Sequence, residues 1–131
     1  MELHARTQLP IAQLEPSINS STSLVRGVVT LVWPYSSSTS STSILLVEPD
    51  FRLRRNKGQV RITFQGSSAK VVARSGLNSG DRLVLGLEGV EWIEDEGAIK
   101  TPGRGVDWEL RFGGRVILQV RDRLCNHQDW Y

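Results

Sequence analysis

The chain contains little cysteine and little histidine. Its 131 residues include one cysteine, Cys125, and two histidines, His4 and His127. A single cysteine cannot form an internal disulfide, which is typical of proteins from a reducing compartment. Both histidines lie in terminal segments and have no metal-ligand spacing to Cys125 or to each other. The sequence therefore predicts no disulfide, no bound metal and no cofactor.

Long hydrophobic runs are also absent. Runs such as Leu31-Val32-Trp33 fall far short of the ~20 apolar residues that span a bilayer, and the N-terminal residues lack the apolar core of a signal peptide. Hydrophobic residues make up 39% of the chain and charged residues 23%, which is ordinary for a globular protein. A chain of this length commonly forms one domain. We expect a single soluble, intracellular domain with no membrane partner.

No constellation of catalytic residues is present. The acidic residues are clustered in one run instead of forming a spaced pair: Glu88, Glu91, Glu94, Asp95 and Glu96. The glycine-rich stretches at 97–105 and 113–114 do not lead from a strand into a helix, so they do not indicate a phosphate-cradling loop. The sequence predicts a binding protein and not an enzyme.

The hydrophobic pattern predicts an all-β domain with one helix at residues 24–121. Residues 1–23 form an N-terminal segment leading into it, in which Leu9, Ile11 and Leu14 could pack one short turn onto the body. Residues 122–131 form a C-terminal tail or the start of a linker. Apolar or alternating runs predict strands at 24–33, 44–47, 59–65, 82–92, 108–112 and 115–120.

One helix is predicted at Ser67–Ser75, with Ser67 or Ser68 as its cap and Gly76 at its end. It falls between the third and fourth strands. The last two runs are separated by Gly113-Gly114, which is either a tight turn or a bend. A helix in this position, together with Gly27 to let the first strand curl, predicts a five-stranded oligonucleotide-binding (OB) barrel.

The charged residues are distributed unevenly along the chain. The net charge is only +2, which excludes a histone-like polycation. From Phe51 to Arg74 there are seven cations and no acid, whereas the run from Glu88 to Glu96 is purely acidic. OB barrels commonly bind ligands across strands two and three and their flanking loops, where the cationic run lies. Four cations are the candidates for phosphate contacts: Arg54, Arg55, Lys57 and Arg61.

Single-stranded nucleic acid also needs flat side chains on which bases stack. The aromatic candidates are Trp33, Tyr35, Phe64 and Trp92, with Phe51, Trp108 and Phe112 as further possibilities. Each could instead fill the core, and Phe64 shares the parity of the buried set in its strand. Arg61 and Thr63 have the opposite parity, so we expect both to be exposed on the binding face.

Several segments together resemble one family. They are Gly27-Val28-Val29 running to Trp33-Pro34, Leu-Leu-Val-Glu-Pro-Asp at 45–50, Phe64-Gln65-Gly66 before the helix, and Gly80-Asp81 leading to Trp92. Their order and spacing resemble the telomeric single-stranded DNA-binding barrel of protection-of-telomeres proteins, most of all fungal members that carry it at the N-terminus of a longer chain.

The resemblance implies a non-catalytic domain that binds G-rich single-stranded telomeric DNA in the nucleus, at the telomeric region of chromosomes. It also maps Trp33, Phe64 and Trp92 onto nucleotide-contact positions. Two alternatives stay open. The barrel could serve self-association or the docking of a telomere or replication partner protein, or it could bind RNA in translation or tRNA handling.

Overall fold

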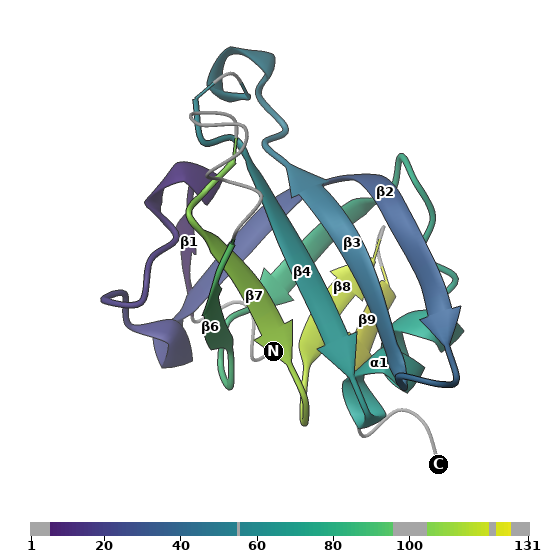
Figure 1. Cartoon of the computed structure of the whole chain (residues 1–131). Coiled ribbons are helices and arrows are strands. Elements are labelled where there is room, and N and C mark those ends of the chain that lie inside the picture. Colours follow the sequence, from purple (N-terminus) through teal and green to yellow (C-terminus); the bar gives the residue numbers. More distant parts are fainter. Residues whose placement is uncertain (1–5, 55, 96–104, 121–122, 127–131) are drawn as a thin grey trace.

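The computed structural model describes residues 6–54, 56–95 and 105–120, and the backbone of 123–126. These residues form a mostly β structure with one α-helix (Figure 1). The helix, α1, spans Ser67–Arg74. The strands are β1 (Thr7–Leu9), β2 (Ser23–Ser36), β3 (Ser41–Val47), β4 (Gln59–Gln65), β5 (Arg82–Gly86), β6 (Glu91–Glu94), β7 (Trp108–Phe112), β8 (Ile117–Val120) and β9 (Arg123–Asn126).

The strands form one mixed sheet in the order β6-β7-β4-β3-β2-β5-β8-β9, with β1 beside β2. Strand β7 runs parallel to β4, whereas β8 runs antiparallel to β5. The two runs separated by Gly113-Gly114 therefore pair with different strands, so these glycines form a bend and not a hairpin turn. In Figure 1 the sheet curls until β8 and β9 lie behind β3 and β4.

Gly27 allows the curl of the first long strand. Around this residue β2 passes from pairing with β5 to pairing with β3, and Val28 pairs with residues of both. A Cβ atom at Gly27 would lie 2.5 Å from Leu46 Cγ and 2.7 Å from the carbonyl oxygen of Val47. Only glycine permits this close approach, as the sequence predicted.

The helix packs one face onto the sheet but is capped differently from the prediction. Ala69, Val71 and Val72 are buried in the main core, as their spacing indicates. The N-cap is Gly66, not Ser67 or Ser68. The Ser68 hydroxyl instead donates to the carbonyl oxygens of Gln65 and Phe112, because its side chain is turned into the core.

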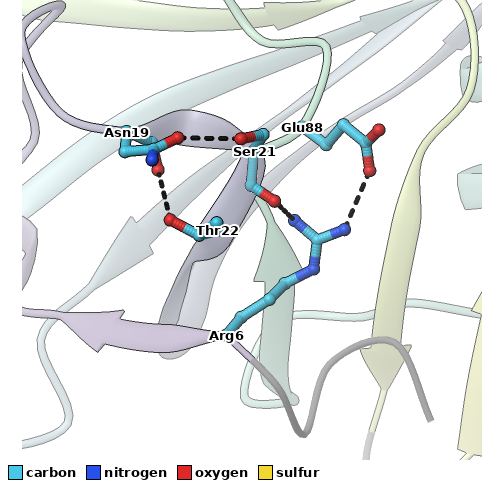
Figure 2. Close-up of polar contacts among 5 residues, drawn as sticks. All are labelled: Arg6, Asn19, Ser21, Thr22 and Glu88. Carbon is cyan, nitrogen blue, oxygen red and sulfur yellow. Dashed lines mark hydrogen bonds and ion pairs between the residues drawn. The ribbon is translucent and has the colours of Figure 1, made fainter.

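The N-terminal segment is part of the sheet and of the core. Strand β1 pairs in parallel with β2, and Ile11 and Leu14 are buried in the main core. The Arg6 guanidinium holds this segment in place by donating to the Ser21 carbonyl oxygen at 2.6 Å and to Glu88 at 2.8 Å (Figure 2). At the other end of the chain, β9 lies within the predicted tail 122–131 and pairs with β8.

Two predicted boundaries were wrong. The expected strand 82–92 is two strands, because the turn at Leu87–Val90, with Gly89 at φ +82°, separates β5 from β6. Strand β6 then pairs with β7. The serine-rich stretch 35–43 lies outside the predicted strands 24–33 and 44–47, yet most of it continues β2 and β3 as far as the pair Ser36 and Ser41. No helix in the described ranges is long and apolar enough to cross a membrane.

Candidate nucleic-acid interface

A β-bulge in β2 turns Leu31 and Trp33 outward. Val29 pairs with Leu46 and Leu31 pairs with Leu45, so Thr30 is an extra residue on β2. An extra residue reverses which side of a strand faces the core. Val25 and Val29 are buried in the core, whereas Leu31 is 51% exposed. The reversed parity places Trp33 outside, at 40% exposure. A second register shift lies between Trp33 and Ser36, and Tyr35 within it is 38% exposed.

Trp33 lies beneath a cation from a strand two positions away in the sheet. The Arg61 guanidinium carbon on β4 is 4.7 Å from the centre of a Trp33 ring, within the range of a cation–π contact. The strand between them contributes Ser43, which pairs with Trp33 on one side and with Thr63 on the other. Trp33 and Arg61, predicted as separate contacts, are therefore parts of one cluster.

Acidic residues on β7 and β6 partly offset the positive charge of Arg61. Glu109 on β7 lies 3.8 Å from Arg61 Nε and 3.3 Å from the Arg111 guanidinium. The carboxylate is mostly buried, while Arg61 keeps nearly half of its side chain exposed. Glu91 on β6 lies opposite Arg111 in the strand register. We name the exposed surface of Leu31, Trp33, Tyr35 and Arg61 the outer face.

Thr63 does not extend this surface as expected. Its side chain is buried and shares a 2.9 Å hydrogen bond with the Ser43 hydroxyl. The prediction that Thr63 is exposed was therefore wrong: its short side chain bonds to the adjacent strand, whereas the longer Arg61 side chain stays 45% exposed. Thr63 therefore supports the strand pairing beneath the outer face.

The other two predicted stacking residues, Phe64 and Trp92, both pack against the core, Phe64 completely and Trp92 in part. Phe64 is fully buried and its ring stacks on that of Phe112, with centroids 5.7 Å apart. Trp92 pairs with the buried Leu110 in the strand register and packs against the main core. The regular alternation of β4 turns Phe64 inward, so its predicted stacking role is wrong. Trp92 is only partly buried, and a nucleotide contact there stays a prediction.

The remaining predicted cations lie on the connection 48–58, at the opposite end of the β3–β4 hairpin from the turn that follows Tyr35 (Figure 1). Arg54 donates from Nε to the Glu48 carbonyl oxygen at 2.6 Å and packs its guanidinium 4.1 Å from the Phe51 ring. Lys57 Nζ lies 3.6 Å from an Asp107 carboxylate oxygen. Arg55 lies outside the described residues. The structure therefore does not gather these cations around Trp33.

The only resolved pKa shifts among the described groups also belong to this connection. Hydrogen bonds from the Arg52 side chain and backbone lower the pKa of the Asp50 carboxyl below its usual value. The same side-chain contact raises the pKa of Arg52. Both groups are at the surface, so the pair stiffens the turn without creating an acid or a base for chemistry.

The sequence reasoning missed several neighbours of the cluster. Leu31, Ser43, Glu109 and Arg111 adjoin Trp33 or Arg61 through strand pairing or ion pairs. Their side of the sheet depends on the bulge at Thr30 and on the parallel pairing of β7 with β4. The sequence carries no clear signal for the bulge, because residues 28–33 are almost all apolar and do not alternate. Among the described residues, no three His, Cys, Asp or Glu side chains form a metal-binding group.

The sequence matches the model of one known protein family. Residues 4–129 match the model of a family described as a domain of unknown function (DUF8502). The chain belongs to this family. No curated protein sequence matches the DUF8502 chain.

Two solved structures share the fold of this DUF8502 domain. Fission yeast Pot1 with ssDNA has a TM-score of 0.59 and 14% sequence identity, over 88% of this chain and 40% of that one. Schizosaccharomyces pombe Pot1pC bound to the ssDNA CGGTTACGGT has a TM-score of 0.53 and 16% identity, over 82% of this chain and 77% of that one. The DUF8502 chain thus spans less than half the length of the first. At these identities the similarity concerns the fold, which is OB-like.

Proposed function

We propose that the DUF8502 chain is a five-stranded OB barrel that binds single-stranded DNA on its outer face without catalysis. The fifth strand of the barrel is β7 and β8, joined by their bend. The observation that carries the proposal is the half-exposed Trp33 ring beneath the Arg61 guanidinium, since an aromatic platform beside a cation suits a base and its phosphate. The fold similarity to the DNA-bound Pot1 structures supports it.

In this interpretation a base stacks on Trp33 and the next base stacks on Tyr35. Trp33 and Tyr35 are two residues apart near the end of β2, and each is more than a third exposed. Arg61 approaches a phosphate while its stem covers the edge of the indole. The ion pair with Glu109 partly neutralises the charge of Arg61. Stacking therefore contributes more to the affinity for DNA on this surface than charge does. We further propose G-rich telomeric DNA as the ligand and the nucleus as the location.

Replacing Trp33 by alanine tests this platform. Base–aromatic stacking contributes about 1–3 kcal/mol per base, so Trp33→Ala should weaken binding about tenfold or more in fluorescence anisotropy with a G-rich telomeric oligonucleotide. The matched control is Phe51→Ala, which removes a 76% exposed ring from the connection 48–58 and should leave the affinity within about twofold.

Several results would contradict the proposal. Absence of binding by the unmodified chain at low salt and tens of micromolar protein would exclude DNA binding by this domain. Equal losses in the Trp33 and Phe51 variants would place the ligand elsewhere. Tighter binding to RNA of matched sequence would favour the RNA-binding alternative.

A protein-docking function is the second candidate. Leu31 is exposed beside Trp33, and both Arg61 and Lys57 already have acidic partners. An apolar surface with offset charge suits a protein partner or a second copy better than a phosphate backbone does. This alternative predicts a dimer in sedimentation velocity and little loss of DNA binding in the Trp33→Ala variant.

A further inference from the structure

A hollow of about 200 Å³ lies where the end of β2 meets α1. Its lining includes Tyr35 from the strand and Lys70, Ala73 and Arg74 from the helix. The three helical residues follow the i, i+3, i+4 spacing, which places them on one side of an α-helix. All three are exposed, whereas Ala69, Val71 and Val72 of the same helix are buried. The core contacts therefore fix the helix so that its two cations line the same hollow as Tyr35.

The charge around this hollow differs from that of the outer face. The sequence contains no acidic residue from Phe51 to Gly80, a range that includes all of β4 and α1. Among the described side chains, Lys70 has no carboxylate within ion-pair distance. Arg61 and Lys57, by contrast, lie against Glu109 and Asp107. The charge of Lys70 is thus less offset than that of Arg61, and we expect Lys70 to attract a phosphate toward this hollow.

We propose that this hollow is a phosphate-binding extension of the interface, which receives the nucleotide that follows the one on Trp33. The proposal rests on the proposed function. The base stacks on Tyr35 and its phosphate lies between the Lys70 ammonium and the Arg74 guanidinium. The bound strand then leaves the sheet over the helix and away from the acidic strand β6. The alanine at position 73 leaves room between the two cations.

The double variant Lys70→Gln/Arg74→Gln tests this path. Each phosphate contact to a single strand contributes about 0.7 to the slope of log K against log salt concentration. We therefore expect this slope to fall by about 1.4 in magnitude and the affinity at low salt to fall at least fivefold. The matched control, Arg26→Gln/Arg82→Gln, removes the same charge from two exposed arginines on β2 and β5.

A second measurement locates the contact along the DNA. The affinities of the unmodified chain and the double variant are compared for oligonucleotides shortened one nucleotide at a time. Once the nucleotide that lies over the helix is removed, the two proteins should bind the DNA with equal affinity. Circular dichroism and thermal unfolding of each variant check that the helix is intact.

The outcomes separate this inference from the proposed function. A normal slope and affinity in the double variant, together with a large loss in Trp33→Ala, would overturn the helix extension and leave the outer face standing. Equal losses in the double variant and its control would show an effect of net charge alone and would also overturn it. Absence of DNA binding by the unmodified chain would overturn both.

Discussion

Gly27 is the residue on which the curl of β2 depends, and its replacement gives a stability prediction. Gly27→Ala would place a Cβ 2.7 Å from the backbone oxygen of Val47, which cannot move aside as a side chain can. We expect the free energy of unfolding to fall by about 1–3 kcal/mol, as for other overpacked sites. Urea denaturation followed by circular dichroism measures this loss.

Gly113→Ala is the matched control for that change. A Cβ at Gly113 would meet no atom within 4 Å, so the same substitution should change the free energy of unfolding by no more than about 0.5 kcal/mol. If Gly27→Ala were as stable as this control, the close crossing of β2 over β3 would not be the reason for the glycine.

Single residues also show how far the sequence can locate a site. The regular alternation of Val60, Ile62 and Phe64 predicts one buried side, and all three are buried. The role suggested for Phe64 by family resemblance failed, since its ring stacks on Phe112. Parity within a regular strand was the safer guide here, because side chains alternate between its two sides.

At the scale of elements, the bulge and the strand ends were beyond the sequence pattern. The position of the helix and the strand β4 follow from local composition and were predicted well. The extra residue Thr30 can be recognised only from its partner strand, because a bulge is a mismatch between two strands. The outward direction of Trp33 depends on that mismatch, and a second register shift follows around Tyr35, so the positions of both became clear only with the pairing of β2 and β3.

The N-terminal segment gives the prediction for this scale. Ile11 is fully buried in the main core, so Ile11→Ala should lower the free energy of unfolding by about 2–5 kcal/mol, the range for large core deletions. Gln13→Ala, in the same 3-10 turn but exposed, should change it by no more than about 0.5 kcal/mol. Comparable small effects in chemical denaturation would mean that the segment packs loosely and contributes little.

For the whole molecule, the net charge of +2 is the sum of a cationic stretch and an acidic run, which the fold keeps on different elements. The acid-free stretch 51–80 includes the connection between β3 and β4, the strand β4 and the helix α1. The acidic run begins at Glu88 and continues on β6 at the edge of the sheet. The fold offsets part of both signs, since Glu88 pairs with Arg6 and Glu109 with Arg61. A bound strand is therefore expected to follow β2 toward α1 and away from β6.

Ligand-linked stability tests the whole molecule without any mutation of the fold. A ligand that binds only the folded state at about 100 times its Kd adds about 2.7 kcal/mol to the free energy of unfolding. For a chain of this size that corresponds to a rise in Tm of roughly 5–10 °C. We expect this rise with G-rich single-stranded DNA and a much smaller one with a duplex of the same sequence, because paired bases cannot stack on Trp33 and Tyr35. An equal rise with the duplex would indicate binding through charge alone, since both ligands carry phosphates but only the single strand offers free bases.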